Sequence, residues 1–401
     1  MKVLVINAGS SSLKYQLIDM ATEQAIAKGG CERIGLQGSF LKHKANGNEV
    51  TIESPMPDHT AAIELTLKTL VDEKYGAIKS MDEIDAVGHR LLHSGGEYDR
   101  SVLINDEVMK VCENNIELAP LHQPANIKGV LACKAIMPNV PMVATFDNAF
   151  HATMPEKAYI FGLPYEFYTK YRVRRYGAHG TSHRFVSSEA AKYLGVNPEK
   201  GFKVITCHLG NGSSIAAVKD GKCVDTSMSF TPLGGVPMGT RTGDLEPAIL
   251  EYLADKKNVD IKELVRICNK ESGVSGVSGV SSDFRDLTKA SKEGNHRAQL
   301  ALDIFTYSCK KFVGSYAAAM GGVDCLVFTA GIGEHDAAVR KAVASDLAYM
   351  GIVIDEEKNA NPTDGICDIT GEGSRAKVLI IPTNEELVIA RDTAELAAAS
   401  K

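Results

Sequence analysis

Residues 7–14 combine small, hydroxyl-bearing and cationic side chains in a pattern that suits phosphate binding. An apolar run over residues 3–6 is followed by Gly9, Ser10 and Ser12, and then by Lys14. Glycine lets the main chain approach a ligand closely, and the hydroxyl and ammonium groups can donate to several oxygens of one anion. The apolar run itself predicts a strand in the middle of a sheet covered on both faces. The sequence therefore predicts a strand, a phosphate-binding turn and a second strand.

The same arrangement recurs about two hundred residues further on. An apolar strand from Val204 leads into a turn of glycine, asparagine and serine, and a second strand ends at Asp220-Gly221. The turn comprises His208, Leu209, Gly210, Asn211 and Gly212. Two such hairpins indicate two related halves, each bringing a phosphate-contacting turn to a shared cleft. The alternative is a pair of unrelated turns, because glycine and serine are common in hairpins.

Charged residues follow several of the predicted strands. Arg90 comes after a short strand at residues 84–88, and Asp147 ends a strand at residues 140–146. Ligands of open α/β sheets bind beyond the carboxyl ends of strands, so both residues are candidates for a site. Glu385 and Glu386 stand where the last helix should begin, and the helix dipole alone would favour carboxylates there.

Length and composition limit the class of protein. The 401 residues are too many for one ordinary core and predict two domains, and the 44% hydrophobic and 23% charged residues are typical of a globular protein. A net charge of −6 argues against a broad nucleic-acid surface. Nine cysteines without a C-x-x-C pair favour buried thiols in a reducing compartment over a zinc site. With no signal peptide or membrane segment predicted, we expect a cytoplasmic protein.

Hydrophobic spacing and turn residues predict the elements that position these groups. A hairpin is expected at residues 40–52, turning at Asn46-Gly47, and a strand at residues 325–328. An ordered loop is expected at residues 273–282, with a flexible linker as its alternative. Helices are expected at residues 59–75, 124–137, 183–194, 247–256 and 296–320, and from about 386 to the C-terminus.

Common nucleotide and hydrolase motifs are absent from the sequence. It contains no G-x-x-x-x-G-K-[ST], and Gly331-Ile332-Gly333 lacks the third glycine of a dinucleotide fingerprint. Neither H-E-x-x-H nor G-x-S-x-G occurs. Phosphate binding is therefore assigned to the two hairpins.

Over essentially its whole length, the chain resembles the acetokinase family, within the superfamily of sugar kinases, actin and the ATPase domain of heat-shock chaperones. The segments that carry the resemblance are residues 7–14, Gly88-His89-Arg90, residues 175–183, residues 208–214, Arg241-Thr242-Gly243-Asp244 and residues 382–386. The resemblance implies an α/β fold of two actin-like (ribonuclease H-like) domains. Each is a mixed β-sheet with flanking helices, and the nucleotide lies in the cleft between them. Residues 1–150 with 386–401 would form the acid-binding domain, and residues 151–385 the nucleotide-binding and dimerisation domain.

The activity implied is reversible phosphoryl transfer between ATP and acetate, giving acetyl phosphate and ADP. By the same resemblance, Arg90 and His122 bind the acid, while His179 and Arg241 contact the transferring group. Asn7 and Glu385 hold Mg²⁺ or Mn²⁺. Asp147 is the family's acid/base, but a carboxylic acid is already ionised near neutral pH and needs no base. We therefore hypothesise that Asp147 orients the metal's water shell or Arg241.

The resemblance also assigns the nucleotide and acid contacts. ATP would be contacted by Lys14, Ser10, Ser12, His208, Leu209, Gly210, Asn211, Gly212, Asp283, Phe284, Arg285, Gly331, Ile332, Gly333, Glu334 and His335. The acid pocket would be lined by Leu92, Leu121, Ala178 and Pro232. Position 178 is more usually Phe in the family and position 92 more usually Val. The smaller Ala178 should widen one wall, and the larger Leu92 should refill it.

Two other functions remain open at this stage. A propionate or butyrate kinase of the same family would differ only in pocket volume, and we expect acetate to be preferred, with propionate a poorer substrate. A chaperone-like ATPase that drives a partner would hydrolyse ATP without an acid. The family also implies a homodimer formed through the second domain, with no nucleic-acid or membrane partner.

Overall fold

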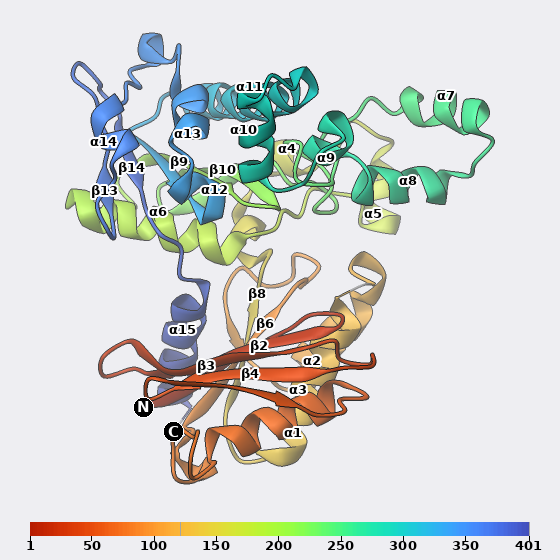
Figure 1. The fold of residues 1–401 in the computed structure, drawn as a ribbon, viewed down its shortest axis with the longest axis vertical. Coiled ribbons are helices and arrows are strands. Elements are labelled where there is room, and N and C mark those ends of the chain that lie inside the picture. The colour runs from red at the N-terminus through yellow and green to blue at the C-terminus, as the bar shows by residue number, and fades with distance from the viewer. Residues whose placement is uncertain (121, 401) are drawn as a thin grey trace. The chain divides into compact units, whose positions relative to one another are not determined.

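The computed structural model describes residues 1–120 and 122–400, which form two compact units (Figure 1). Unit 1 comprises Met1–Ala152 and Asn384–Lys401, and unit 2 comprises Thr153–Thr383. These boundaries lie beside the expected division at residues 150 and 385. The assignment of acid binding to the first unit and nucleotide binding to the second stays a prediction. None of the described helices is both long and apolar enough to cross a membrane.

In unit 1 a mixed sheet carries helices on both faces, with strand order β5-β4-β3-β2-β1-β6-β8-β7. Strands β1, β6 and β8 run parallel, and β1 to β5 form an antiparallel meander. The elements are β1 (Lys2–Ala8), β2 (Ser12–Asp19), β3 (Gln24–Glu32), β4 (Phe40–Ala45), β5 (Asn48–Glu53), α1 (His59–Leu70), η1 (Met81–Glu83), β6 (Ala86–Leu91), β7 (Val102–Leu103), α2 (Asp106–Asn114), η2 (Ile116–Leu118), α3 (Gln123–Ile136), β8 (Met142–Phe146) and α15 (Glu385–Ala399).

Strand β1 lies in the middle of this sheet and is buried on both faces, as its uninterrupted apolar run predicted. Leu4 and Ile6 pack into the core that includes residues of α1 and α3. The intervening residues Val3 and Val5 pack against Ile389 on α15. Helix α15, drawn in dark blue in Figure 1, thus returns from the end of the chain to cover the sheet of the first unit.

In unit 2 a second mixed sheet has the strand order β11-β10-β9-β12-β14-β13. Its elements are α4 (Glu156–Tyr159), α5 (Tyr165–Tyr171), α6 (Gly180–Leu194), β9 (Lys203–Leu209), β10 (Ser213–Lys219), β11 (Lys222–Thr226), α7 (Ala248–Lys257), α8 (Ile261–Lys270), α9 (Gly273–Ser278), α10 (Phe284–Lys292), α11 (His296–Met320), β12 (Cys325–Thr329), α12 (Ala330–His335), α13 (Ala337–Ala344), η4 (Ala348–Met350), α14 (Glu356–Ala360), β13 (Cys367–Asp368) and β14 (Lys377–Ile380), and η3 (Ala149–Thr153) joins the two units.

The two sheets differ in size but share the arrangement of their central strands, which agrees with the prediction of two related halves. In each, the central strand forms a hairpin with the next strand and pairs in parallel with a later one: β1 with β2 and β6, and β9 with β10 and β12. The fold class is confirmed as two mixed sheets with flanking helices. Both predicted phosphate turns therefore sit at the end of a central strand.

Most predicted elements are confirmed, with differences at their ends. Helix α1 ends at Leu70 rather than at residue 75, and Asp58 caps its start by accepting a hydrogen bond from the Ala61 amide at 3.0 Å. Helix α6 begins at Gly180, before the predicted residue 183, and ends at Leu194 with Gly195 as a left-handed cap. Helix α11 occupies the predicted residues. The cysteines are buried, as predicted, except Cys268, which is half-buried.

The prediction of an ordered loop over residues 273–282 holds for residues 279–282, which form no helix or strand, but it was wrong for residues 273–278. Residues 273–278 form helix α9, which is neither a loop nor a flexible linker. Val274 is 1% exposed, and Val277, one helical turn later, packs against the same core as α11. Burial of this valine pair stabilises a helix whose glycines would disfavour it in isolation.

Candidate active site

The turn of the first hairpin leaves polar groups open to a ligand. The Gly9 amide donates to the Ser12 carbonyl at 2.8 Å, which closes the turn, and the His59 ring contacts the Gly9 carbonyl at 2.6 Å. Ser10 and Lys14 are exposed and Ser12 is half-buried. The three side chains predicted to bind phosphate therefore remain accessible within unit 1.

Arg90 and Asp147 form a bidentate ion pair that the sequence did not predict. The Nε and Nη2 atoms of Arg90 donate to the two carboxylate oxygens at 3.0 and 2.6 Å. The pair forms because parallel strands β6 and β8 end at the same edge of the sheet. The pKa of Arg90 is raised, mainly by the charge of Asp147. Burial opposes this shift, and the charges of Glu385 and Glu386 add to it. The expected roles of Asp147 toward Arg241 or a metal's water shell stay predictions.

Glu385 opens helix α15 and lies in the electrostatic neighbourhood of this pair. Burial raises its pKa to about 7, opposed by Arg90 and reinforced by Asp147 and Glu386. Asn384 caps the helix by accepting from the Leu387 amide at 3.1 Å. Both glutamates are therefore at the helix start, as predicted. The position at the helix start does not fully describe Glu385, because the charges of Arg90, Asp147 and Glu386 also act on it.

Asn126 is a positioning residue that the sequence analysis missed. Its side chain on α3 donates to the Ala8 carbonyl at 2.7 Å and accepts from the Leu92 amide at 3.0 Å. It thereby joins the end of β1, one residue beyond Asn7, to the segment after β6. The available signal was an asparagine between the apolar residues Ala125 and Ile127 of the predicted helix.

Leu121 and His122 are the next two residues of the predicted acid site. Leu121 lies outside the described residues. His122 precedes helix α3 and is exposed, and its amide donates to the Ala119 carbonyl at 3.1 Å.

In unit 2 the second hairpin closes tightly between β9 and β10. The Gly210 amide donates to the Gly212 carbonyl at 3.2 Å, and the Ser213 hydroxyl donates to the Gly210 carbonyl at 2.9 Å. The Asn211 side chain packs on Gly239, where a Cβ atom would lie 1.9 Å from its Oδ1 atom. Leu209 is buried in the core and His208 is half-buried. The main chain from Gly210 to Gly212 is thus the part that a phosphate can approach.

His179 and Arg241 converge on this turn. A Cβ atom at Gly212 would lie 3.6 Å from Cε1 and Nε2 of His179 and 3.7 Å from Nη1 of Arg241. The His179 ring also stacks on His208, with centroids 4.1 Å apart. His179 adopts a left-handed conformation with φ of 58° at the cap of α6, which is uncommon for a residue with a side chain.

Arg241 is a half-buried cation without a carboxylate partner in the described part of the chain. Its Nη1 atom donates to the Pro232 carbonyl at 3.4 Å and lies 3.7 Å from the Met238 sulfur. Burial lowers the pKa of this guanidinium group. A guanidinium group held in this way is suited to binding an anion from outside the chain.

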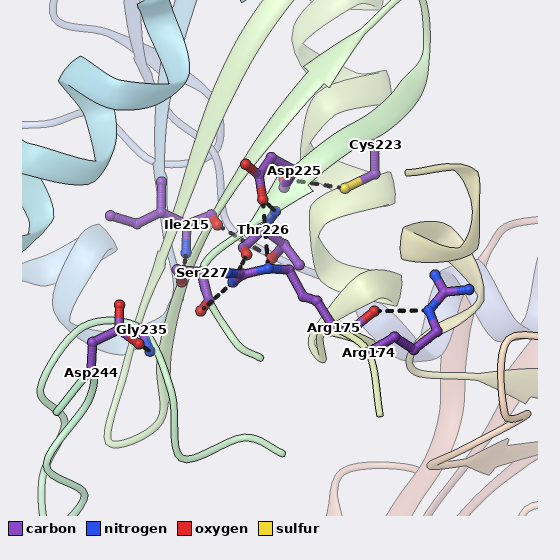
Figure 2. Close-up of polar contacts among 9 residues, drawn as sticks. All are labelled: Arg174, Arg175, Ile215, Cys223, Asp225, Thr226, Ser227, Gly235 and Asp244. Atoms are coloured by element: carbon purple, nitrogen blue, oxygen red, sulfur yellow. Dashed lines mark hydrogen bonds and ion pairs between the residues drawn. The ribbon is translucent and has the colours of Figure 1, made fainter. Parts of the chain in front are cut away.

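Figure 2 shows how the segment before His179 is attached to the second sheet. Arg175 Nη1 donates to the carbonyls of Thr226 and Ser227 at 2.7 and 3.1 Å, and its Nε lies 3.9 Å from Asp225. Burial raises the pKa of Asp225, opposed by Arg175. In the sequence Arg175 is only part of a motif, whereas in the structure it attaches the segment before His179 to the second sheet.

Ala178 and Pro232 also lie in unit 2. Ala178 is buried in a small cluster with Met228 and Met238. Methionine is long and flexible, so this pair fills volume beside the small side chain. Pro232 is half-buried and contacts Arg241 through its carbonyl.

The segment Gly331–His335 lies in helix α12, which begins at Ala330. It starts directly after β12, with Ala330 in the left-handed region at φ of 64°. The Glu334 carboxylate accepts from the amides of Ala330 and Thr383 at 2.8 and 3.2 Å, so it is engaged in capping its own helix. Ile332 is half-buried and packs on the core.

The three consecutive residues Asp283, Phe284 and Arg285 divide between surface and core. Asp283 and the exposed Arg285 form an ion pair at 2.6 Å. The Phe284 side chain is buried and packs edge-on against Phe305, with centroids 4.7 Å apart, so only its backbone is left for a nucleotide contact. Beside Arg285 lies an open cavity of about 480 Å³, lined also by Thr288, Lys289, Lys292, Glu293 and Asp336.

Within each unit, the described side chains are of the kinds that phosphoryl transfer uses. Unit 1 has one phosphate-type turn and Arg90 among carboxylates, and unit 2 has the other turn with Arg241 and His179 beside it. Such groups provide positioning and charge neutralisation. Those are the requirements of phosphoryl transfer. In the described residues no group of three or more His, Cys, Asp or Glu side chains is arranged to hold a metal. A site for Mg²⁺ does not require one, because this ion keeps several waters.

Comparisons with known proteins identify the family of the chain. The model of the acetokinase family matches residues 2–391. The acetate kinase of Clostridium novyi is 58% identical over 398 residues, covering 99% of this chain and 98% of the relative. The acetate kinase of Treponema denticola is 58% identical over 397 residues, covering 99% of this chain and all of the relative (100%).

Solved structures give the same result. The crystal structure of Porphyromonas gingivalis acetate kinase is 49% identical, with a TM-score of 0.95, and covers 98% of this chain and 99% of that one. A propionate kinase from Francisella tularensis is 40% identical, with a TM-score of 0.91 and the same coverage of 98% and 99%. The family model and both relatives span nearly the whole sequence, and so the chain belongs to the acetokinase family.

Proposed function

We propose that this chain is an acetate kinase, which transfers the γ-phosphoryl group of ATP to acetate by direct in-line displacement and runs the reaction in both directions. The observation that carries the proposal is Arg241, a half-buried guanidinium with no carboxylate partner among the described residues, converging with His179 on the Gly212 turn. The transferring group carries its charge on three equatorial oxygens, and these two donors are suited to neutralising it.

Arg90 binds the carboxylate of the acid in this proposal. Asp147 occupies its Nε and Nη2 atoms, so Nη1 is left to donate to a substrate oxygen. Asp147 acts by fixing the plane and position of the guanidinium group. No proton has to move, because the carboxylate that attacks phosphorus is ionised near pH 7.

The metal ion is Mg²⁺ or Mn²⁺, held by Asn7 and Glu385. Oxygen ligands suit such hard cations, and one or two protein contacts suffice. Burial raises the pKa of Glu385 to about 7, and a nearby cation would favour its ionised, coordinating form. When bound, the metal neutralises phosphate charge.

The nucleotide contacts follow the family assignment with two adjustments. Lys14, Ser10, Ser12 and the main chain of residues 208–212 contact the phosphates. Phe284 and Glu334 contribute through their backbones, because their side chains are engaged in the core and in the cap of α12. The cavity beside Arg285 is the proposed place for the adenosine.

Acetate is the proposed acid, and propionate is a poorer substrate. The Francisella relative is a propionate kinase, so the family spans both acids. Met228 and Met238 beside Ala178 fill volume that a larger residue at that position would occupy. The homodimer that the family implies would form through unit 2. Apolar side chains are exposed on its helices α7 and α8: Ile249, Tyr252, Ile261 and Val265.

The proposal is tested by ADP formation from Mg-ATP with acetate, propionate, butyrate or no acid, while hydroxylamine traps any acyl phosphate. We expect acid-dependent turnover with a trapped product, greatest for acetate. Highest turnover with propionate or butyrate would instead identify a kinase for that acid. ATP hydrolysis that ignores the acid would favour a chaperone-like ATPase and contradict the role of Arg90.

A further inference from the structure

A chain of hydrogen bonds runs through the interior of unit 2 to His179. Thr206 Oγ1 lies 2.7 Å from His183 Nδ1, and His183 Nε2 lies 2.7 Å from Ser214 Oγ. Ser214 Oγ in turn lies 2.9 Å from His179 Nδ1. Thr206, His183 and Ser214 are each 0% exposed. The inner end of the chain is therefore shielded from solvent, and its outer end is a residue of the proposed site.

The chain is assembled by the fold of the second sheet. Thr206 and Ser214 lie on the hairpin strands β9 and β10, and His179 and His183 lie one turn apart at the start of α6. His179 is the left-handed cap of α6 and His183 lies in its first turn, and both imidazoles contact Ser214 Oγ. On β9 the residues Ile205, Cys207 and Leu209 face the α11 core, so Thr206 points to the opposite face.

The hydroxyl of Thr206 decides the direction of the chain. A neutral imidazole offers one donor and one acceptor nitrogen, so the protons of the chain point either all inward or all outward. Among the described residues, His183 Nδ1 is the only hydrogen-bond partner of Thr206 Oγ1. A buried hydroxyl proton needs an acceptor, so it goes to His183 Nδ1. His183 Nε2 then donates to Ser214, and Ser214 donates to His179 Nδ1.

This direction places the proton of neutral His179 on Nε2. That nitrogen and Nη1 of Arg241 would lie 3.6 and 3.7 Å from a Cβ atom at Gly212, so both are beside this turn. The opposite tautomer would present a lone pair to the oxygens of a phosphoryl group and would repel them.

We propose that Thr206 and His183 are positioning residues that hold His179 in its Nε2-protonated tautomer, so that a neutral ring donates to the transferring phosphoryl group. The inference deepens the proposed function and rests on the role it gives to His179. It adds a tautomer-selecting chain of buried residues that touch no substrate.

The tautomer of His179 can be measured directly by NMR. The full-length protein, labelled with ¹⁵N-histidine, is examined by NMR without substrates above pH 8, and the His179 signals are assigned by their loss in His179→Gln. We expect the Nε2–H tautomer in the unmodified chain. Thr206→Val keeps the shape but removes the hydroxyl, and it should populate the Nδ1–H tautomer. Thr206→Ser restores the hydroxyl and should restore the Nε2–H tautomer.

Kinetics provide the second readout. Thr206→Val should lower kcat by about 10- to 100-fold with little change in KM for ATP, since loss of one preorganised donor costs about 100- to 1000-fold in other enzymes. Ser214→Ala interrupts the same chain and serves if the valine variant does not fold. The inference is overturned if His179 has the Nδ1–H tautomer in the unmodified protein. It is also overturned if His179 keeps the Nε2–H tautomer fully in both Thr206→Val and Ser214→Ala. If the tautomers are as expected but ATP turnover does not depend on the acid, the proposed function is overturned, and only the role of the hydrogen-bond chain in selecting the His179 tautomer is supported.

Discussion

Arg90 and Asp147 meet through two hydrogen bonds, although 57 residues separate them in the sequence. Asp147 is 2% exposed in its side chain and Arg90 is 25% exposed. Each carboxylate oxygen accepts one hydrogen bond from the fork, so the guanidinium plane is fixed. The proposed acid-binding arginine is thus held in place before any substrate arrives.

Replacement of Asp147 by Asn should therefore affect both stability and catalysis. We expect the free energy of unfolding to fall by about 3 kcal/mol, because a buried charge loses its partner. KM for acetate should rise, because Arg90 is no longer fixed. Urea denaturation and initial-rate kinetics measure the two effects.

A matched control is the exposed bidentate pair of Arg391 and Glu23, with both hydrogen bonds at 2.7 Å. Glu23→Gln should cost less than about 1 kcal/mol, since solvent screens the pair. Equal costs for the two variants would contradict a special role for burial. An Asp147→Asn variant whose Mg²⁺ dependence is unchanged but whose kcat has a new pH profile would contradict a positioning role for Asp147.

Gly88 allows helix α15 to lie directly on β6. A Cβ atom there would lie 2.4 Å from Thr393 Oγ1 and 2.6 Å from Ile389 Cγ2. Gly88→Ala should displace the helix that carries Glu385, lower the free energy of unfolding by about 1–3 kcal/mol and weaken the apparent Mg²⁺ affinity in kinetic titrations.

Gly314→Ala is its control, because nothing lies within 4 Å of a Cβ atom at that position in α11. This change should raise stability by about 0.5–1 kcal/mol. If Gly88→Ala matched this control in stability and Mg²⁺ affinity, the close packing of α15 would not be important for the metal site.

His89 makes the stability of the chain depend on pH. Burial lowers its pKa to about 3, and no hydrogen-bond partner of its Nε2 atom is present in the described residues. The unfolded chain binds a proton near pH 6.5 while the folded chain does not, so this group's contribution falls as pH decreases from about 6.5 toward 3. Between pH 7 and 5 the loss amounts to about 2 kcal/mol.

His89→Gln should remove that part of the pH dependence. The measurement is urea denaturation at pH 7 and pH 5, comparing the change in unfolding free energy with that of the unmodified chain. His296→Gln, at an exposed position, should leave the change as it is. An equal pH dependence in His89→Gln and the unmodified chain would show that His89 does not titrate in this way.

Arg340 fixes the end of helix α12 from the core. It is 1% exposed, its Nη1 atom donates to the carbonyls of Gly333 and Glu334 at 3.0 and 2.9 Å, and its Nε atom donates to the side chain of Asn359 at 2.7 Å. Arg340→Met leaves these acceptors unpaired and should lower the free energy of unfolding by about 3 kcal/mol. KM for ATP should rise by about tenfold, because misplacing a binding segment by about 1 Å costs up to about 100-fold.

The comparison variant is Arg297→Met, which removes an exposed arginine that donates to the carbonyls of Val277 and Gly276 at the end of α9. It should leave KM for ATP unchanged. An unchanged KM for ATP in Arg340→Met as well would separate residues 331–335 from the nucleotide site.

Leu92→Ala should shift the acid preference toward propionate. One methylene in an apolar pocket discriminates by about 1–3 kcal/mol, so the ratio of kcat/KM for propionate over acetate should rise by about 10-fold or more. The steady-state kinetics of both acids provide the measurement. No shift would exclude Leu92 from the pocket wall.

The sequence by itself determined the elements that depend on neighbours in the chain. The two hairpins follow from an apolar strand, a small-residue turn and a second strand, and helix α11 follows from its hydrophobic spacing. The family motifs also lie within short segments. Such patterns are readable because turn geometry and the burial of a strand depend on adjacent residues.

The tertiary structure alone decided which distant groups meet. The pair of Arg90 and Asp147 depends on the register of β6 and β8, and the chain from Thr206 to His179 depends on how α6 lies on β9 and β10. Phe284 lies in the core because α10 packs against α11, and α9 is a helix because α11 buries its valines. Sequence spacing does not specify these contacts, since they arise from packing between elements far apart along the chain.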